Sequence, residues 1–547
     1  MNAERLLQHY EKIADAPDAI ARLRRFILDL AVRGKLVPQG ASEAVSGFHR
    51  KGDDPAAPFE IPENWRWITI GEQLELLNGM AFKPTDWVSD GLRIVRIQNL
   101  NKRDAPFNFC RPDSARERSL IDDGTFLISW SGTPGTSFGA FIWDRGPAVL
   151  NQHIFRCDFK TDQYRSEFLR LAINGRLDEM IAKAHGGVGL QHITKGRLEA
   201  LFIPLPPLAE QQRIVAKVNE LMVLCDELES ARTERETKRD RLAAASLARL
   251  NTPDPETLRD DARFALDALP ALTARPDQIK QLRQTILNLA VHGKLVPQDP
   301  ADQPAWQLLT LVDLRRSGGR VPMVEIDPES APYKIPSTWK WASLDQLIVF
   351  GPQNGISPRS TNLDDAPKAI TLTATTSGKF NPAYFKRVEG VFSSESEYWL
   401  SDGDLLFQRG NTPEYVGMAA IYRGPPRTFL FPDLIIKVRI SEQLNLSYVH
   451  IASISPPGRK YLTENASGAQ ATMPKINQST LLSLPIPLPP LAEQHRIVAK
   501  VDELMALCDQ LETSLTTADE TRKKLLDALL AEALAPVDAG ALQEAAE

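Results

Sequence analysis

The chain has 547 residues, 43% of them hydrophobic and 24% charged, and a formal net charge of −6. This length exceeds one hydrophobic core and predicts several domains of an ordinary globular composition. No apolar run reaches the about 18 residues of a membrane span, and the charged N-terminal stretch does not resemble a signal peptide, so we expect a cytoplasmic protein. The four cysteines lack metal or disulfide spacing and are expected to be buried in a reducing compartment.

Two long segments of the sequence occur twice. Residues 23–39 (LRRFILDLAVRGKLVPQ) return at 282–298 (LRQTILNLAVHGKLVPQ), and residues 203–229 return at 486–512. The chain is therefore two copies of one module, each with a helical unit, a variable body and a second helical unit. The predicted domains are a helical unit over 1–39, a body over 40–205, a central helical region over 206–299, a second body over 300–487 and a distal helical region over 488–547.

The first helical unit contains a strong helix that begins near Ala16-Pro17-Asp18. Gly34 is the expected C-terminal cap, and Gly293 has the same place in the second copy. Residues 40–58 are rich in Gly, Pro, Ser and Asp and predict a linker.

Each variable body opens with a tryptophan pair, Trp65 with Trp67 and Trp339 with Trp341. Their alternation indicates a strand, and we favour core anchors over stacking on bases. Short β-rich runs follow, and each body then has one amphipathic helix, so both bodies are predicted to be α+β. The runs cover 91–101, 122–135, 368–380 and 401–414, and the helices are expected near 166–183 and 446–463.

The second repeated segment predicts a helix from about 208 to 250, preceded by a proline pair that suits a first helical turn. Its apolar residues alternate in steps of four and three, as in helices that pack lengthwise on a partner. A short amphipathic helix on a globular core is the alternative. We expect 230–249 to be a solvated helix, 251–261 a turn and 539–547 a frayed tail. The seam residues proposed for the coiled coil and for partner docking are Ile214, Val218, Leu221, Leu228, Ile497, Val501, Leu504 and Leu511.

The negative charge is unevenly distributed. By count, residues 41–205 carry about −1 and residues 301–485 about +1, which leaves about −6 on the repeated helical parts. The near-neutral bodies can carry local basic faces. The acidic helices are more typical of a protein-docking surface than of one that wraps DNA.

Signatures of catalysis are missing from the sequence. There is no GxxxxGK[ST] phosphate loop, and Gly186-Gly187-Val188-Gly189 follows a predicted helix, which is the wrong context for a dinucleotide or S-adenosylmethionine turn. Residues 381–384 (NPAY) resemble the NPPY motif of adenine methyltransferases but lack its second proline and an upstream cofactor loop. The histidines show no metal-ligand spacing. We therefore expect a protein that binds and positions, with no catalytic residues, no metal and no cofactor of its own.

The duplicated GKLVPQ and PLPPLAEQ-x-RIV segments around two dissimilar bodies resemble the specificity (S) subunit of type I restriction–modification enzymes. The resemblance covers essentially the whole chain. The landmarks at 403–406 (GDLL) and 410–413 (GNTP) also recur in that family, whereas the first body has Gly124-Thr125 in place of Gly-Asp.

The resemblance implies two target-recognition domains, each reading one half of a bipartite asymmetric DNA site. The helices would form antiparallel coiled coils with pseudo-two-fold symmetry. Two methyltransferase subunits would dock on them and methylate adenines with S-adenosylmethionine, and motor–nuclease subunits using ATP and Mg would complete the complex. The alternative is a coiled-coil scaffold that assembles partners without reading DNA. A fused methyltransferase or nuclease is a third possibility, but the sequence lacks the cofactor and metal motifs that such an enzyme needs.

Asn and Gln suit adenine edges, Arg and Lys suit guanine, and hydroxyls and cations suit phosphates. On this basis loop residues of these types are the DNA-binding candidates. In the first body they are Lys83, Arg96, Gln98, Asn99, Lys102, Ser131, Thr133, Gln152, Gln191 and Lys195. In the second body they are Gln353, Asn354, Arg359, Lys379, Gln408, Arg409, Asn411, Thr412, Gln470 and Lys475.

Overall fold

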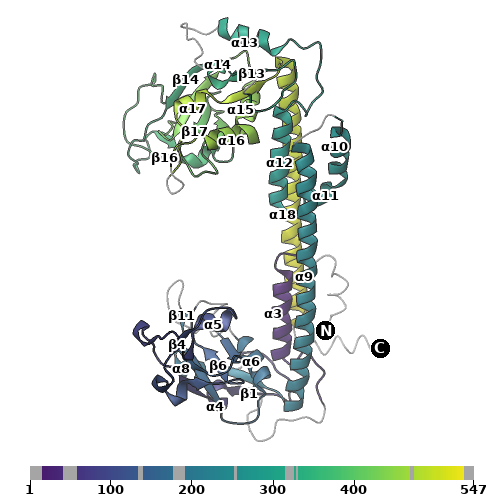
Figure 1. Cartoon of the computed structure of the whole chain (residues 1–547), viewed down its shortest axis with the longest axis vertical. Helices are drawn as coiled ribbons and strands as arrows, with labels where there is room; N and C mark the ends of the chain where they lie inside the picture. Colours follow the sequence, from purple (N-terminus) through teal and green to yellow (C-terminus); the bar gives the residue numbers. More distant parts are fainter. Residues whose placement is uncertain are drawn as a thin grey trace. The chain divides into compact units, whose positions relative to one another are not determined.

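The computed structural model describes residues 15–40, 58–132, 139–176, 191–251, 256–314, 326–327, 331–468 and 473–534. The chain divides into unit 1, Met1–Arg235 with Asp519–Glu547, and unit 2, Glu236–Ala518. Each unit contains one variable body and the helices packed against it (Figure 1). The tail 539–547 and the interior of the predicted linker 40–58 lie outside the described residues.

The body of unit 1 is built on an antiparallel sheet with the strand order β2-β10-β6-β8. All four residues of β6 are buried, as expected for a strand inside a sheet with both faces covered. Helix α6 packs against β8, where the side chain of Asn174 bonds both the amide and the carbonyl of Ala140, at 2.7 and 3.0 Å. The elements are β2 (Leu74–Asn78), β10 (Ile154–Phe159), β6 (Phe126–Ser129), β8 (Gly139–Ile142) and α6 (Ser166–Asn174).

A second sheet in unit 1 has the order β4-β3-β9-β5. The β-rich run expected over 91–101 stops at Val95, and helix α5 (Ile97–Asn101) follows, which corrects that prediction. Asn99 explains the break, because its Oδ1 accepts the Arg96 amide at 3.0 Å and its Nδ2 donates to two loop carbonyls. The strands are β4 (Asn108–Cys110), β3 (Leu92–Val95), β9 (Ala148–Leu150) and β5 (Leu120–Ile121).

The body of unit 2 repeats the first sheet of unit 1 in the order β14-β19-β17-β18. A small ladder of β15 with β16 stands where unit 1 has its second sheet. The internal repeat therefore extends from the motifs to the fold of the bodies. The strands are β14 (Ile348–Asn354), β19 (Ile435–Ile440), β17 (Leu405–Gln408), β18 (Ala419–Ile421), β15 (Lys368–Ile370) and β16 (Phe385–Arg387).

In both units the first and last strands of the body pair antiparallel. Strand β1 (Arg66–Thr69) pairs with β12 (Phe202–Leu205), and β13 (Lys340–Ser343) pairs with β20 (Pro485–Leu488). The four tryptophans of the opening motifs are 2–7% exposed, which confirms that they are core anchors. Short helices complete the bodies: α4 (Ile70–Gln73), α8 (Lys195–Glu199), α14 (Leu344–Leu347), α17 (Gln478–Leu482) and the 3-10 turns Pro84–Asp86, Pro112–Ser114, Glu117–Ser119 and Leu372–Thr375.

The single helix predicted near 446–463 is two helices, α15 (Leu446–Ile454) and α16 (Pro456–Glu464). Pro456 lacks the N–H needed to continue α15, and Ser455, which has an extended backbone, caps α16. The counterpart predicted near 166–183 begins as α6. Its residues from 177 onward lie outside the described residues.

The long helices are α9 (Leu208–Asn251) and α18 (Leu491–Leu534), which confirms the helix predicted over about 208–250. Residues of α9 up to Arg235 belong to unit 1 and the later ones to unit 2, and α18 is divided after Ala518. The seam residues Ile214, Val218 and Cys225 are at most 4% exposed and join the core of the unit 1 body. Their counterparts Ile497, Val501 and Cys508 do the same in unit 2, so the seam packs on the chain's own elements.

An arginine on each repeated short helix is paired with the long helix. In unit 1 the short helix is α3 (Ala19–Val32), and its Arg24 contacts Asp226 at 2.6 Å and Glu229 at 2.7 Å. In unit 2 the short helix is α12 (Pro276–Val291), and its arginine forms the same two contacts at 2.6 and 2.7 Å. These residues are Arg283, Asp509 and Glu512.

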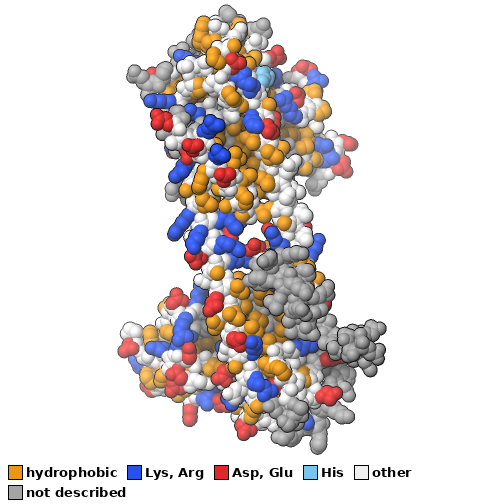
Figure 2. Space-filling view, turned by 90° about the vertical axis from the view of Figure 1, so that its right-hand side faces the viewer, with side chains coloured by type: hydrophobic (Ala, Val, Ile, Leu, Met, Phe, Trp, Pro, Cys, Tyr) orange, Lys and Arg blue, Asp and Glu red, His pale blue; other side chains and the backbone are white. Residues whose placement is uncertain are grey.

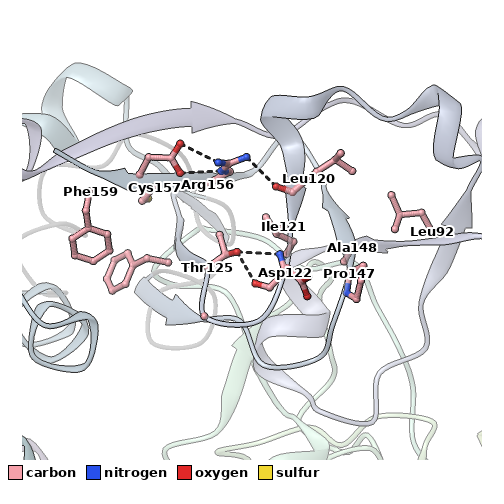
Figure 3. Close-up of a pocket in the computed structure, with 13 residues that line it drawn as sticks. Leu92, Leu120, Ile121, Asp122, Thr125, Pro147, Ala148, Arg156, Cys157 and Phe159 are labelled. Atoms are coloured by element: carbon pink, nitrogen blue, oxygen red, sulfur yellow. Dashed lines mark hydrogen bonds and ion pairs between the residues drawn. The ribbon is translucent and has the colours of Figure 1, made fainter.

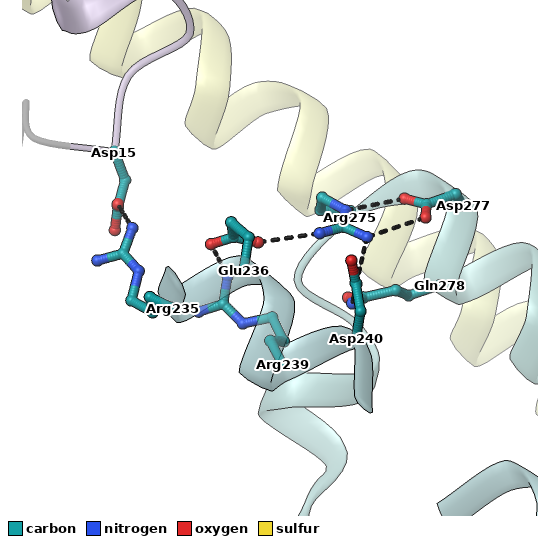
Figure 4. A network of polar contacts seen from close by, with 8 residues as sticks. All are labelled: Asp15, Arg235, Glu236, Arg239, Asp240, Arg275, Asp277 and Gln278. Carbon is teal, nitrogen blue, oxygen red and sulfur yellow. Dashed lines mark hydrogen bonds and ion pairs between the residues drawn. The ribbon is translucent and has the colours of Figure 1, made fainter. Parts of the chain in front are cut away.

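The beginning of α12 is held to α9 by charged side chains (Figure 4). Arg275, which precedes α12, contacts Glu236 at 3.0 Å and Asp277 at 3.1 Å and also bonds Asp240. Helices α10 (Leu258–Asp267) and α11 (Leu269–Leu272) come before it, so the turn predicted over 251–261 ends before Leu258, while 252–255 lie outside the described residues. Helix α13 (Ala305–Leu314) leads into the second body.

The repeated PLPPLAEQ motif joins each long helix to its body through a buried carboxylate. Glu493 is 1% exposed, accepts the indole N–H of Trp339 at 2.9 Å and also bonds Gln298 of the GKLVPQ motif. Burial raises the pKa of Glu493 above its ordinary value of 4.5, although these hydrogen bonds oppose the shift. Glu210 is its counterpart in unit 1 and is also fully buried, with a raised pKa.

An isosteric Glu493→Gln substitution is expected to change the pH dependence of unit 2 stability. A raised carboxyl pKa favours the protonated folded form. The stabilising contribution of the Glu493 carboxyl to the free energy of unfolding is therefore fully present below about pH 4.5, and it is lost as pH rises through the folded-state pKa. Gln does not titrate, so the variant should gain stability relative to the native chain across that window. Urea unfolding from pH 4 to pH 8 measures the difference.

Glu503→Gln is the control, because Glu503 lies on the same helix and pairs with Lys500 at the exposed surface, at 2.9 Å. Its stability curve should run parallel to the native one. A parallel curve for Glu493→Gln would contradict the buried-carboxyl assignment.

Candidate nucleic-acid interface

Four loops of unit 1 meet at one end of its main sheet, where β2 and β6 end and β10 begins. The register places Asn78 opposite Phe155 and Ser129 opposite Ile154. We call this group loop cluster 1. It contains residues 78–82, 130–132, 150–153 and 191–193. Main-chain hydrogen bonds join its loops: Gly79 N to Ile154 O, Met80 N to Leu150 O, Trp130 N to His153 O and Ile193 N to Trp130 O, at 2.9–3.3 Å.

Unit 2 has the same arrangement, which we call loop cluster 2, with residues 354–357, 409–412, 431–434 and 475–476. Asn354 lies opposite Ile436, and Gln408 opposite Ile435. The bonds repeat one for one: Gly355 N to Ile435 O, Ile356 N to Phe431 O, Arg409 N to Leu434 O and Ile476 N to Arg409 O, at 2.7–3.2 Å. Both bodies thus present the same framework of loops with different side chains, and this arrangement suits surface readout.

Many of the predicted DNA-binding residues lie in or beside these two clusters. Cluster 1 contains Gln152, exposed at the surface, and β11 (Gln191–His192), which pairs with β7 (Ser131–Gly132). The candidates of cluster 2 are half-buried or exposed, and so is Gln353 directly beside it; they are Asn354, Arg409, Asn411, Thr412 and Lys475. The side chain of Gln191, and all of Thr133 and Gln470, lie outside the described residues.

Three predicted candidates are buried, and the structure gives two of them a structural role. Asn99 shapes the start of α5, as described above. Gln408 is 0% exposed, and its Nε2 donates to Leu372 O and Thr375 Oγ1, both at 3.0 Å. Its Oε1 accepts Asn411 Nδ2 at 2.6 Å, so both ends of the amide are used within the chain. Ser131 is 1% exposed within β7. Because both are buried and bonded within the chain, Asn99 and Gln408 are no longer candidates for contacts with DNA bases. The residue type alone does not show which of these amides is buried by packing.

The remaining candidates lie around the clusters. Lys83 is exposed before the turn Pro84–Asp86, and Gln98 and Lys102 are exposed on and just after α5. Arg96 follows Val95, whose carbonyl accepts the amide of Asn151 in cluster 1 at 3.0 Å. Lys195 begins α8 and donates to Leu76 O at 2.9 Å. In unit 2, Arg359 is exposed, and Lys379 lies 3.7 Å from Asp509 on α18, directed toward the helix.

One residue type is shared by both clusters: Asn354 is among the predicted candidates, whereas its counterpart Asn78 is not. Asn78 ends β2 as Asn354 ends β14, and each is followed by glycine. The signal was the Asn-Gly pair at the end of the first long strand of both bodies.

Most seam residues proposed for partner docking are buried by packing against other parts of the same chain. Ile214, Val218, Ile497 and Val501 are at most 3% exposed, and Leu221, Leu504 and Leu511 are partly buried, whereas Leu228 is 37% exposed. This corrects the docking prediction for the buried members. Other exposed leucines lie off the seam at matching positions of the two helices: Leu208 and Leu491, and Leu224 and Leu507. Figure 2 shows hydrophobic side chains gathered among charged ones on one face.

A pocket of about 610 Å³ lies at the opposite end of the unit 1 sheet from loop cluster 1 (Figure 3). Thr125 at its edge donates to Asp122 O at 2.6 Å and accepts the Asp122 amide at 3.1 Å. Arg156, which lies opposite Leu127 in the sheet, contacts Asp158 at 2.9 Å. Among the described residues no group of three His, Cys, Asp or Glu side chains could hold a metal ion.

The same positions in unit 2 hold a buried ionic group. Lys437, opposite Leu406, is 2% exposed, and Asp404 of the GDLL motif is 0% exposed. Asp404 contacts Arg439 at 2.7 Å and lies 3.9 Å from Lys437. The departure from Gly-Asp in the first body therefore removes an acid from the start of β6, and Asp158 supplies one from β10 instead.

The NPAY segment forms an exposed turn, in which Asn381 Oδ1 accepts the Ala383 amide at 3.0 Å. This is a local Asx turn, and it gives the motif a structural role.

Every helix among the described residues is too short or too polar to cross a lipid bilayer. The four cysteines are buried, as predicted.

The sequence model of the type I restriction modification DNA specificity domain matches residues 62–236 and 336–518, once in each body. The chain belongs to this family. The specificity subunits of the EcoEI and EcoAI type I restriction enzymes of Escherichia coli are each 26% identical to it, over 94% and 93% of both chains, respectively. A chain from a structural study of assembly and conformational transition of the type I R-M system shares the fold, with 19% identity and a TM-score of 0.50 over 87% of this chain and 99% of that one.

The family match confirms the predicted resemblance and the predicted tandem of two α+β domains. Both matched segments end inside a long helix, α9 or α18, so the specificity domain includes the first part of that helix as well as the body.

Proposed function

We propose that this chain is the DNA-specificity subunit of a type I restriction–modification complex. Each body reads one half of a two-part asymmetric site through its loop cluster. The single observation that carries the proposal is the matched pair of loop clusters, which keep one main-chain framework and differ in their side chains. Two similar frameworks with different side chains suit two half-sites of different sequence.

The family match supports this role over that of a scaffold that assembles partners without reading DNA. The chain is proposed to be non-catalytic and to act in the cytoplasm. Double-stranded DNA, two methyltransferase subunits and motor–nuclease subunits are its proposed partners. S-adenosylmethionine, ATP and Mg are proposed to bind those partners and to supply methyl transfer and motor activity there.

Co-expression with a methyltransferase subunit of the same system, in cells that lack other methylases, tests the proposal. Single-molecule sequencing should then find methyladenine in one new two-part motif, with one adenine marked on each strand. The same cells with the methyltransferase subunit alone are the control.

A stable complex that leaves no methylation mark would favour the scaffold function. A short uninterrupted motif would mean that only one body reads DNA. Either result would contradict the proposal as stated.

A further inference from the structure

One polar side chain occupies the same place in both loop clusters. Asn78 is the last residue of β2 and lies opposite Phe155, and Asn354 is the last residue of β14 and lies opposite Ile436. The next residue in each body makes the matching hydrogen bond to β10 or β19 described above. Since the surrounding loops differ in sequence, the retained asparagine needs a reason of its own.

The glycine that follows each asparagine is required by the fold. A Cβ on Gly79 would lie 2.6 Å from Leu150 O, and a Cβ on Gly355 would lie 2.7 Å from Phe431 C. Both contacts are with backbone, which cannot move aside easily. The asparagines have no such role. Among the described residues only Asp18 and Arg427 are non-glycine residues with positive φ, so neither asparagine supplies a left-handed turn.

The side chains are also available for a ligand. Asn78 is exposed, and its amide has no hydrogen bond with any described residue. Asn354 is half-buried, and its Oδ1 accepts one long bond from Gln478 Nε2 at 3.4 Å, which leaves its Nδ2 donor without a partner in the described part of the chain. Asparagine at these two positions is therefore explained neither by turn conformation nor by capping.

The chemistry around Asn354 suits a nucleic-acid backbone. Arg409 and Lys475 come from adjacent loops of cluster 2, joined through the Gly410–Lys475 bridge and the bond from Ile476 N to Arg409 O at 2.8 Å. Neither cation forms an ion pair with a described residue. Thr412 adds an exposed hydroxyl. Cations and hydroxyls of this kind hold phosphates and fix register, which leaves the neighbouring amide to meet a base edge.

We propose that Asn78 and Asn354 make the same specific contact in the two half-sites, each amide pairing with N6 and N7 of an adenine in the major groove. This inference rests on the proposed function. It names the side chain with which each body recognises one base of its half-site. It requires both half-sites to contain an adenine at the contacted position.

The test uses the full chain in complex with its methyltransferase partner, bound to a pool of DNA sites randomised in both half-sites. Asn78→Ala should lose about 5- to 150-fold of the preference for one adenine in the half read by unit 1, with the other half unchanged. Asn354→Ala should do the same in the half read by unit 2. Asn465→Ala is the control, because Asn465 is exposed at the end of α16 and its side chain donates to the local carbonyl of Tyr461, so it should keep the native profile.

Aspartate variants separate a base contact from loss of fold. Asn78→Asp and Asn354→Asp keep the size of the side chain and remove its N–H donors, so preference should move from adenine toward cytosine, whose N4 is a donor. Co-purification with the partner shows that each variant assembles.

Unchanged profiles for both alanine variants would overturn the inference while leaving the proposed function intact. Uniform weakening across all sequences, with a shallower salt dependence, would overturn it as well, because that pattern marks a phosphate contact. A native complex without any sequence preference would overturn both the inference and the proposed function.

Discussion

An Asp404→Ala variant is expected to lose about 3–5 kcal/mol of the folding stability of unit 2. Asp404 is fully buried, contacts Arg439 at 2.7 Å and lies 3.9 Å from the ammonium of Lys437, which is only 2% exposed. Burial lowers the pKa of Lys437, and Asp404 is the main charge that opposes this shift. Alanine would leave a buried ammonium without its counter-charge. Hydrogen exchange of the β17 and β19 amides measures the loss locally.

Asp402→Ala is the matched control two residues away. Asp402 pairs with Arg423 at 3.2 Å, but both side chains are more than half exposed, so its loss should cost less than about 1 kcal/mol. An Asp404→Ala/Lys437→Met double variant removes both buried charges and should recover much of the stability lost by the single variant. Equal effects of Asp402→Ala and Asp404→Ala would contradict the prediction.

The carboxylate of the GDLL landmark is therefore paired inside the body of unit 2. In unit 1 the same place holds Thr125, whose side chain bonds Asp122 in its own turn, while Asp158 pairs with Arg156 (Figure 3). An ion pair is kept in both bodies, although the acid comes from a different strand. Sequence comparison shows a lost aspartate at position 125, and only the register of β6 with β10 shows its replacement.

Duplication made the architecture predictable from the sequence. Each motif is local, and its second copy fixes both the domain order and the helix limits, as at Leu208–Asn251. The internal elements of the bodies were less predictable. The run 91–101 has the composition of a strand, yet the amide of Asn99 bonds three backbone groups and turns the chain into α5. Such a choice depends on where a polar side chain is buried.

The candidate site was predicted only as a set of residue types. Asn and Gln are candidates because their amides both donate and accept hydrogen bonds, and these bonds can be made equally to a base edge or to a backbone group. Gln408 is buried and bonds the backbone carbonyl of Leu372, while the half-buried amide of Asn354 can still bond a ligand. The helical seam shows the same limit. Periodicity identifies which face of α9 is packed, but Ile214 packs on the chain's own body.

Replacing Gly34 with alanine is expected to destabilise unit 1 by about 2–5 kcal/mol. Gly34 ends α3 with φ +67°, and the bond from Lys35 N to Leu30 O at 2.9 Å completes a Schellman cap. An L side chain is strained at this φ. A Cβ would also lie 2.7 Å from Cδ of Pro62, which leads into the first strand of the body. Local unfolding measured by hydrogen exchange in α3 and β1 reports the effect.

Gly146→Ala separates the two causes of that loss. Gly146 lies in the same unit with φ +72°, and a Cβ there would meet nothing within 4 Å, so its variant should show only the conformational cost of about 1–2 kcal/mol. The excess for Gly34→Ala then measures the contact between the GKLVPQ turn and the body. Gly293→Ala should reproduce that excess in unit 2, because its Cβ would lie 3.0 Å from Cδ of Pro336. If Gly34→Ala and Gly146→Ala lower folding stability by the same amount, Pro62 can shift without an energetic cost, and the repeated glycine serves only to end the helix.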